Sequence, residues 1–217
     1  MQTEVGTAVR PDARVAYTTP FWKIFGSLVR ETVTCRACGK RIISHAMRCA
    51  HSIVLPVEEQ AGEAFTIETL FMNQLGYEPL DDICERDHEV PDDGGCEARG
   101  ARYKATEVLH AAPVLVLHVL RFTWCAAQRS AVKRNTRVDF ETILPPLNGQ
   151  RPYDLRAVVE HRGLHSITAT DSGHYVAFVR GQDAQWYECN DAQDPRRCSV
   201  NEVRSAQAYL LFYERQE

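Results

Sequence analysis

The sequence predicts an α+β fold in which an antiparallel sheet dominates and helices are few. Three observations support this prediction. The second half of the chain contains apolar or alternating runs of strand length, separated by turn-forming residues. Two of these runs are joined by Gly181-Gln-Asp-Ala, a connection short enough for a hairpin turn. Only residues 66–75 show the apolar spacing of an amphipathic helix.

The first half of the chain is predicted to contain a strand pair followed by one helix. Residues 1–20 are polar and carry two prolines, which indicates an irregular beginning. Residues 28–34 are rich in β-branched side chains and lead into a Cys-x-x-Cys turn, and 41–57 has the pattern of a returning strand. Thr66 is a candidate N-cap of the helix, and Gly76 is a candidate stop.

The second half begins after an acidic, glycine-rich stretch at 79–100, which predicts a loop or a degenerate finger tip. Residues 114–122 form a nearly continuous apolar run, as expected of a strand buried on both faces. The remaining predicted strands are 153–159, 174–179, 185–189 and 208–213. Together these segments predict an antiparallel sheet.

The composition excludes several classes of protein. With 44% hydrophobic and 25% charged residues over 217 positions, the chain is globular and not disordered. The net charge of −4 provides no basic field for nucleic acid or an anionic membrane. The longest apolar run, 111–117, is too short to span a bilayer, and the N-terminus shows no signal peptide. We therefore expect a cytoplasmic or nuclear protein with no nucleic-acid or membrane partner.

A histidine and an asparagine-aspartate pair mark the ends of two neighbouring predicted strands. His174 opens the first strand, and Asn190 and Asp191 follow the second. If the two strands form a hairpin, an imidazole lies beside an amide or a carboxylate at one edge. A general base held in one tautomer by a third group needs that arrangement. The same residues also fit a surface histidine beside a polar turn, and taken alone they leave both interpretations open.

Several motifs occur along the chain in a characteristic order. They are Ser-Gly-His-Tyr-Val-Ala at 172–177, Trp-Tyr-x-x-Asn-Asp at 186–191 and Ala-Tyr-x-Leu-Phe-Tyr at 208–213. Upstream, 112–122 ends in Arg-Phe, and Phe25, Val33, Cys35 and Cys38 precede a glycine turn. Over residues 20–215 this order resembles the ubiquitin-specific protease family, the papain-like cysteine peptidases that remove ubiquitin.

The resemblance implies a papain-like cysteine peptidase fold with its helical thumb largely missing. It implies an N-terminal segment at 1–27, β-rich zinc-ribbon-like fingers at 28–105 and an antiparallel palm sheet at 106–217. The implied activity is deubiquitination, the thiol-dependent hydrolysis of the peptide or isopeptide bond after the C-terminal glycine of ubiquitin. Ubiquitin and ubiquitinated proteins are the implied partners.

The resemblance also implies roles for individual residues. His174 matches the catalytic histidine, Asn190 matches the residue that orients it, and Asp191 matches a neighbour that assists or substitutes. Gly173 and Tyr175 flank the histidine where the family passes the diglycine tail of ubiquitin, so they are the implied substrate-binding residues. For Tyr175, packing within the sheet is the alternative interpretation.

The family's nucleophile box, Gly-Asn-Thr-Cys-Tyr, does not occur in this sequence. The first cysteine, Cys35, is already matched to the fingers, and Cys125, Cys189 and Cys198 are poorly placed to replace the nucleophile. Without a thiolate, a histidine and an amide cannot form a thioester intermediate. We therefore expect this chain alone to be inactive.

Two explanations for the missing box compete: loss of an N-terminal half, or a catalytically dead ubiquitin-binding scaffold. Without a thumb, the sheet face near His174 is expected to expose an apolar patch, a liability for a free monomer. The large apolar side chains there are Val176, Phe178, Trp186 and Tyr187. Because they have not been replaced by polar ones, loss of the N-terminal half is the favoured explanation.

The resemblance further implies one structural zinc ion and no catalytic cofactor. Zinc accepts S, N or O donors in a tetrahedral set. The candidate ligands are Cys35, Cys38 and Cys96, with Cys84, His88 or Asp93 as the fourth. A filled site and a decayed one remain alternatives. A zinc-ribbon nucleic-acid binder is a further rival, but the net charge of −4 opposes it.

The other histidines are predicted not to be ligands. His45, His51 and His110 are expected to be solvated or to lie on strand faces. His118 lies inside an apolar strand, so a core histidine with satisfied hydrogen bonds is expected there.

Overall fold

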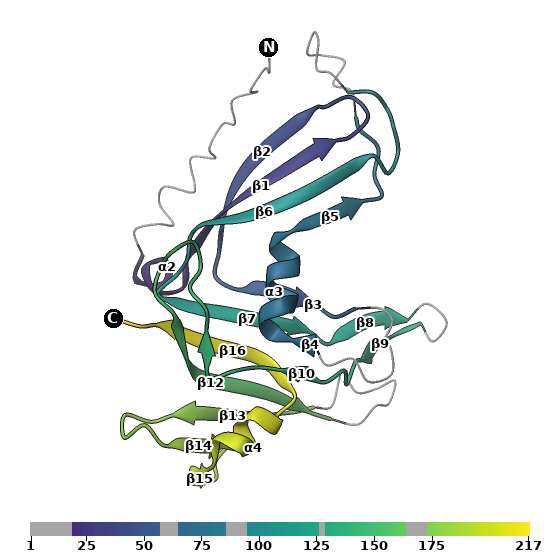
Figure 1. Ribbon diagram of the computed structural model, residues 1–217. Helices are drawn as coiled ribbons and strands as arrows, with labels where there is room; N and C mark the ends of the chain where they lie inside the picture. The colour runs from purple at the N-terminus through teal and green to yellow at the C-terminus, as the bar shows by residue number, and fades with distance from the viewer. Residues whose placement is uncertain (1–18, 57–64, 86–94, 126–128, 164–172) are drawn as a thin grey trace. The chain divides into compact units, whose positions relative to one another are not determined.

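The computed structural model describes residues 19–56, 65–85, 95–125, 129–163 and 173–217. The chain divides into two compact units. Unit 1 comprises Met1–Cys49 and Met72–Ala112, and unit 2 comprises Ala50–Phe71 and Pro113–Glu217. Each unit is built on its own sheet, and the described part of the chain is strand-rich with few helices, as the α+β prediction requires (Figure 1).

The described residues of unit 1 include the short helix α2 and a four-stranded antiparallel sheet in the order β2-β1-β6-β5. Its elements are α2 (Pro20–Phe25), β1 (Ser27–Cys35), β2 (Arg41–Arg48), β5 (Tyr77–Leu80) and β6 (Arg102–His110). Thr19 caps the helix, because its hydroxyl accepts from the Trp22 N–H at 3.4 Å. The predicted strand pair after residue 28 is confirmed as β1 and β2.

The core of unit 1 is small. Its buried apolar side chains in the described residues are those of Val29, Cys35, Cys84, Val108, Ala111 and Ala112. Ion pairs Arg30–Glu107 and Arg48–Glu31 link neighbouring strands, but they are partly exposed and each contributes little. A sheet with so little buried apolar area needs a further source of stability.

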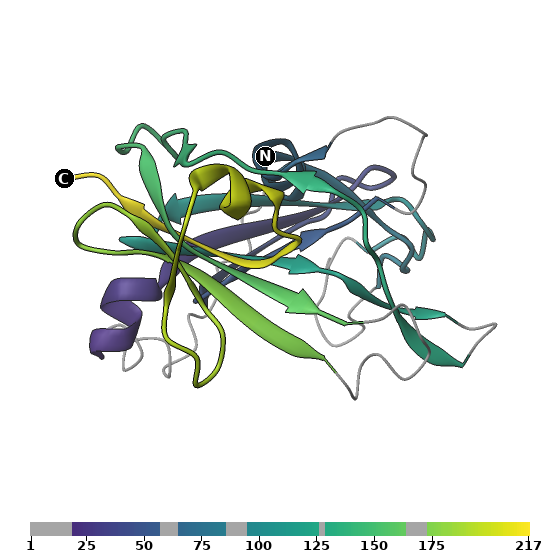
Figure 2. The same cartoon turned by 90° about the horizontal axis from the view of Figure 1, so that it is seen from below.

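Unit 2 contains most of the strands. They are β3 (His51–Val54), β4 (Phe65–Thr66), β7 (Val114–Leu120), β8 (Phe122–Cys125), β9 (Ser130–Lys133), β10 (Val138–Asp139), β11 (Ile143–Leu144), β12 (Tyr153–Arg162), β13 (His174–Arg180), β14 (Trp186–Cys189), β15 (Arg196–Cys198) and β16 (Ala208–Arg215). Helix α3 (Ile67–Leu75) begins in this unit, and α4 (Val200–Ser205) connects β15 to β16, in yellow in Figure 2. No helix in the described ranges is long and apolar enough to cross a membrane.

The large sheet of unit 2 has the order β15-β14-β13-β12-β16-β7-β3, with β11 also paired to β12. Its pairs are antiparallel except at one edge, where β3 runs parallel to β7. The predicted antiparallel sheet is thus confirmed, except that β3 pairs in parallel with β7. The sequence pattern also predicts one continuous strand at 41–57, whereas the structure has two strands there, β2 and β3. The chain instead breaks at Cys49 and Ala50, where it passes from one unit to the other.

Strand β7 forms the centre of the core, as its apolar sequence predicts. Leu115, Leu117 and Val119 are fully buried, and Val116 is nearly so. Other strands contribute further fully buried side chains, among them Tyr153, Leu155, Val158, Val176, Leu211 and Tyr213. Each large apolar side chain stabilises the fold by about 1.5–3 kcal/mol relative to an exposed one.

The large apolar side chains expected to form an exposed patch near His174 are buried or half-buried. Val176, Phe178 and Trp186 share one face of the β13–β14 hairpin, because alternate strand residues point the same way, and all three are buried. Tyr187 is half-buried, and its hydroxyl donates to Asp183 at 2.8 Å. These side chains therefore give no support to the favoured explanation for the missing nucleophile box.

Two local predictions have different outcomes. The helix at 66–75 is confirmed as α3, with the Thr66 hydroxyl accepting from the Thr69 N–H at 3.2 Å. The prediction of an irregular stretch at 79–100 is wrong at its start, because strand β5 includes Pro79 and Leu80. A proline is tolerated there because β5 is an edge strand, whose outward N–H groups need no partner. Residues 86–94 lie outside the described ranges.

His51 and His118 of unit 2 both lie on strands. His51 lies on β3 and is buried, with its ring 5.4 Å from that of Phe71. His118 packs its ring 4.8 Å from that of Tyr209, as a core histidine should. Its Nε2 atom, however, is buried without a hydrogen-bond partner among the described residues, so the expectation of a satisfied histidine is wrong.

Acidification is expected to destabilise unit 2. Burial lowers the pKa of His118, and burial together with the charge of Lys133 lowers the pKa of His161. Below about pH 6.5 the unfolded chain binds these protons while the folded chain does not, so stability falls as the pH is lowered through that value. For each of these histidines, the free energy of unfolding falls by at most about 1.4 kcal/mol per pH unit. Urea unfolding between about pH 5 and 7.5 measures this pH dependence of the free energy of unfolding. The His118→Phe variant should show a weaker pH dependence. An unchanged pH dependence in that variant contradicts the role assigned to His118.

Candidate functional site

Two cysteines lie on a tight turn at the end of β1. The Gly39 N–H donates to the Cys35 carbonyl at 2.9 Å, and the Cys35 N–H donates to the Lys40 carbonyl at 2.9 Å. Gly39 has a φ of 77°, a left-handed conformation that glycine adopts without strain. The turn brings Cys38 back beside Cys35, as a metal-binding knuckle requires.

The second cysteine pair comes from a stretch about fifty residues further along the chain. The Cys84 N–H donates to the Ala98 carbonyl at 3.0 Å, and the Glu97 N–H donates to the Cys84 carbonyl at 2.9 Å. These bonds hold Cys96 next to Cys84. The ligand atoms of Cys35, Cys38, Cys84 and Cys96 all lie within 4.8 Å of one another.

This cluster has the dimensions of a zinc site. The Sγ atoms are 3.7 Å apart for Cys35–Cys96 and also for Cys38–Cys84. Tetrahedral thiolates at about 2.3 Å from zinc are about 3.8 Å from one another. All four cysteines are free of disulfides. The four predicted cysteines could therefore hold a metal ion, whereas the alternatives His88 and Asp93 lie outside the described residues.

The electrostatics of the cluster favour one thiolate before any metal binds. A hydrogen bond from the Cys38 N–H lowers the pKa of Cys35 to about 7 and outweighs the opposing effect of burial. The Lys40 N–H acts in the same direction on Cys38, but burial and the neighbouring thiols raise the pKa of Cys38 to about 12. Because the thiolate is the metal ligand, Cys35 is the thiol most ready to bind first.

In unit 2, His174 and Asn190 lie side by side at one end of a hairpin. β13 and β14 are antiparallel, with Ala177 opposite Cys189. This register brings the first residue of β13 next to the residue that follows β14, and His174 Nε2 lies 2.5 Å from Asn190 Oδ1. Because an amide oxygen only accepts, the neutral imidazole that fits this contact carries its proton on Nε2 and a lone pair on Nδ1.

Asp191 approaches the other ring nitrogen of His174. Its Oδ2 atom lies 3.5 Å from Nδ1, and its side chain is 76% exposed. A contact this long and this exposed contributes little energy. Asp191 and Asn190 therefore differ in position: only the asparagine contacts the protonated nitrogen.

An ion-pair network ties together the strands on either side of β13. Arg162 on β12 donates to Glu188 on β14 at 3.0 Å, and its guanidinium lies 5.9 Å from the ring centroid of Phe178 on β13. Arg196 also donates to Glu188, at 2.6 Å. Hydrogen bonds from Arg196 and then Arg162 lower the pKa of Glu188, although burial opposes them. The carboxylate therefore stays ionised two residues before Asn190.

Gly173 and Tyr175, the predicted substrate-binding residues, both lie against one buried side chain. A Cβ atom at Gly173 would be only 1.7 Å from Nε2 of His161, so no other residue fits there without displacing that ring. Tyr175 is 50% exposed, and its ring centroid lies 4.8 Å from that of His161 and 5.8 Å from that of Tyr209. Tyr175 therefore packs against neighbouring rings and also offers a free aromatic surface.

No cysteine side chain described in unit 2 is placed to act with His174. Cys189 is adjacent in sequence to Asn190, and consecutive strand residues point to opposite faces. Cys198 pairs with Trp186, and burial raises the pKa of its thiol, which disfavours the reactive thiolate. The side chain of Cys125 lies outside the described residues.

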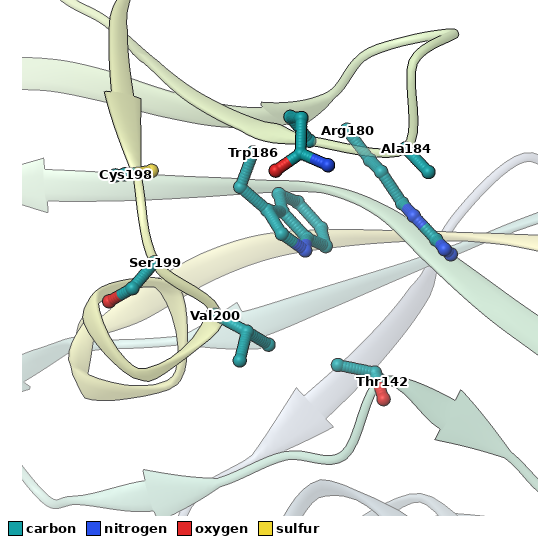
Figure 3. A pocket seen from close by; sticks show the side chains of 8 residues that line it. Thr142, Arg180, Ala184, Trp186, Cys198, Ser199 and Val200 are labelled. Atoms are coloured by element: carbon teal, nitrogen blue, oxygen red, sulfur yellow. The ribbon is translucent and has the colours of Figure 1, made fainter.

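A pocket of about 370 Å³ lies at the other end of β13 (Figure 3). Arg180, Trp186 and Cys198 line it together with residues at the start of α4. Because Arg180 is six residues beyond His174, the pocket is about 20 Å from the imidazole along an extended strand. This pocket and the His174 site are separate features of unit 2.

The sequence patterns do not identify the roles of two buried residues of unit 2. The alternating pattern predicts a strand only to Val159, whereas β12 continues to Arg162 and includes His161. From the sequence, Arg121 is identified only as part of an Arg-Phe motif. It is 1% exposed, and its guanidinium donates to the carbonyls of Ala208 and Thr136 at 2.8 and 2.9 Å. An arginine closing an apolar strand is the signal that could have identified it.

Comparison with known sequences finds relatives of one kind, the ubiquitin carboxyl-terminal hydrolases. The family model described as "Ubiquitin carboxyl-terminal hydrolase" matches residues 7–213. Ubiquitin carboxyl-terminal hydrolase 21 of Homo sapiens is 27% identical over 202 residues, covering 88% of this chain and 33% of that protein. Ubiquitin carboxyl-terminal hydrolase 44 of Ailuropoda melanoleuca is 37% identical over 123 residues, covering 51% of this chain and 16% of that protein. The chain thus spans a third or less of the length of these relatives.

Comparison with solved structures supports the fold. The SAGA Ubp8/Sgf11/Sus1/Sgf73 DUB module bound to ubiquitin aldehyde contains a chain that matches with a TM-score of 0.72. The match is 21% identical and covers 95% of this chain and 45% of that chain. A yeast SAGA DUB module with a mutant Sgf73 subunit matches with a TM-score of 0.74, 21% identity and coverages of 97% and 46%. The predicted papain-like α+β fold is confirmed by these matches.

Proposed function

Because this chain belongs to the ubiquitin carboxyl-terminal hydrolase family, we propose that it forms the fingers and palm of a cysteine-type deubiquitinating peptidase. In this proposal unit 1 supplies the fingers and unit 2 supplies the palm. The observation that carries the proposal is the contact of 2.5 Å between His174 Nε2 and Asn190 Oδ1. It leaves a lone pair on Nδ1, which a general base needs.

The chemistry proposed for this site is acyl transfer through a thioester. Nδ1 of His174 takes the proton of a thiol, and the thiolate attacks the carbonyl carbon of the C-terminal glycine of ubiquitin. The imidazolium then returns the proton to the leaving amine, and water hydrolyses the thioester with His174 again acting as base. Asn190 keeps the ring in the Nε2-protonated tautomer throughout.

The thiol in this scheme comes from outside the residues described here. The sequence has no Gly-Asn-Thr-Cys-Tyr box, and no described cysteine side chain of unit 2 is placed beside His174. Gly173 and Tyr175 are the proposed contacts of the ubiquitin tail, since the glycine has no side chain and half of the tyrosine surface is free. Ubiquitin and ubiquitinated proteins are the proposed partners, and the cytoplasm or nucleus is the proposed location.

A second candidate function is that of a catalytically dead ubiquitin-binding scaffold. The observation in its favour is that no described cysteine side chain of unit 2 is placed beside His174. The two functions differ in one observable property. A peptidase reacts covalently with a ubiquitin probe carrying a C-terminal electrophile, whereas a scaffold binds ubiquitin without reacting.

The experiment has two parts. Titration of ¹⁵N-labelled ubiquitin with the 217-residue chain measures binding, and both functions predict shifts at the ubiquitin C-terminus. The ubiquitin probe is then applied to the protein encoded by the longest native transcript. Covalent labelling supports the peptidase, binding without labelling supports the scaffold, and no binding in either assay overturns both.

In the protein that reacts with the ubiquitin probe, His174→Ala is expected to slow hydrolysis of a ubiquitin-amine substrate by about 10²–10⁴-fold, because the general base is lost. The ubiquitin dissociation constant should change by less than about threefold, since a general base adds little to ground-state binding. His110→Ala, which changes an exposed histidine of unit 1, is the control and should leave the rate unchanged. An equal rate for the His174 and His110 variants contradicts the assignment.

A further inference from the structure

One buried imidazole contacts the residues on both sides of His174. His161 is 4% exposed, and its ring centroid lies 4.8 Å from that of Tyr175. Its Nε2 atom occupies the space where a Gly173 side chain would begin, 1.7 Å from the position of that Cβ atom. The register of β12 and β13 is the cause, because it pairs His161 with Tyr175 and Arg162 with His174.

His161 is itself held from three other strands. The Phe122 ring on β8 lies 5.3 Å from the imidazole, and the Tyr209 ring on β16 lies 6.4 Å from it. Lys133 on β9 donates to the His161 carbonyl at 2.6 Å. The ring therefore has little freedom to move, and any residue that packs on it is fixed relative to the core of unit 2.

Hydrogen bonds to the described part of the chain do not account for the position of the His161 side chain. Its Nδ1 atom is buried and has no partner among the described residues. A buried polar atom without a partner is unfavourable, so hydrogen bonding of the ring does not explain why it lies there. What it does provide is a flat, rigid surface beneath Gly173 and Tyr175.

His174 needs such support because of where it lies. It is the first residue of β13, its side chain is 43% exposed, and strand ends open more readily than strand centres. A general base must be held within about 0.5 Å of its working position. The contact with Asn190 fixes the ring only while the backbone around residue 174 stays in place.

We propose that His161 is a positioning residue: its ring fixes the backbone on both sides of His174 and so keeps the His174 imidazole against Asn190. The consequence for catalysis rests on the proposed function. The geometry at His174 does not, because it can be measured on the chain without ubiquitin.

The test is the tautomer of His174, read from the ¹⁵N shifts of its ring in histidine-labelled protein. In the wild-type chain the shifts should show one tautomer with the proton on Nε2. In His161→Ala they should move toward the averaged values of a free histidine. His118→Ala is the matched control, because His118 is also a histidine of this sheet and also packs on Tyr209, at 4.8 Å, yet it has no described contact with Gly173 or Tyr175. This control should keep the wild-type shifts.

Two further variants keep the test decisive if His161→Ala is poorly folded. His161→Phe retains a ring and should retain the tautomer. Gly173→Ala should lose it in the wild-type chain, because a Cβ atom and the His161 ring cannot share one space, but should cause no further change in the His161→Ala background. The proposal is overturned if His161→Ala keeps the wild-type shifts, if His161→Phe loses them, or if Gly173→Ala has the same effect in both backgrounds.

These measurements also separate the two proposals. If His161→Ala loses the tautomer while the chain fails to bind ubiquitin, the positioning role stands and the proposed function fails. If the chain binds ubiquitin and His161→Ala keeps the wild-type tautomer, the proposed function stands and the positioning role fails. In the full-length peptidase, His161→Ala is expected to lower kcat by at least about tenfold with little change in KM, and His118→Ala should alter neither.

Discussion

Replacing Cys84 by serine is expected to lower the zinc affinity of the chain by at least about 100-fold, since losing even an outer partner of a metal ligand costs about 10–100-fold. Serine supplies a neutral hydroxyl where the site needs a thiolate. The Sγ atom of Cys84 lies 3.7 Å from that of Cys38, so the substitution removes one corner of the tetrahedron. Zinc content per chain after dialysis against a chelator measures the effect.

Cys49→Ser is the matched control for this prediction. Cys49 is an exposed, free cysteine of the same unit, and it is not part of the four-cysteine cluster. It should leave the zinc content at one ion per chain. If Cys84→Ser retains as much zinc as Cys49→Ser, the assignment of the cluster is wrong.

Zinc removal should unfold unit 1 selectively. The buried apolar side chains described in this unit are no larger than valine, so bound metal would supply a large share of its stability. Hydrogen exchange measured after chelation should show lost protection in β1 and β6, while β7 and β12 keep theirs. Equal protection of β1 before and after chelation would contradict a structural role for the metal.

Arg121→Leu is expected to destabilise unit 2 by about 3–5 kcal/mol, because each carbonyl that loses its donor in the protein interior costs about 1–3 kcal/mol. The guanidinium donates to the Ala208 carbonyl at 2.8 Å, to the Thr136 carbonyl at 2.9 Å and to the Arg134 carbonyl at 3.3 Å. Leucine leaves these carbonyls without their donor. Arg121 is 1% exposed, and this burial lowers the pKa of its guanidinium to about 10.

The free energy of unfolding from urea titration measures this effect. Arg137→Leu is the control, because the Arg137 side chain is 74% exposed and pairs with Asp139 on the surface. It should change stability by less than about 0.5 kcal/mol. A neutral or stabilising Arg121→Leu would mean that the hydrogen bonds do not offset the desolvation of the guanidinium.

Local patterns in the sequence were sufficient to place the His174 site. His174 and Asn190 are joined by a hairpin with a short turn, so their proximity follows from the turn length and the alternation of two adjacent strands. Cys35 and Cys38 are likewise linked by a turn with a glycine. Contacts of this kind depend on few residues, and the sequence contains all of them.

Contacts between distant segments could not be predicted in the same way. The choice between Cys84, His88 and Asp93 depends on how a stretch far from Cys35 folds back. The buried state of Val176 and Phe178 depends on which face of the hairpin is covered, and alternation gives no information about that choice. The packing of His161 under Gly173 depends on the register of β12 and β13, which a single sequence does not reveal.

Unit 1 is discontinuous: it is completed by Met72–Ala112 after the chain has contributed Ala50–Phe71 to unit 2. During synthesis on the ribosome, β1 therefore appears long before its neighbour β6, and Cys35 appears long before Cys96. The nascent chain must keep the first knuckle reduced and available until the second has emerged. A metal ion held by all four cysteines of the cluster could therefore bind only after the second cysteine pair has been synthesised.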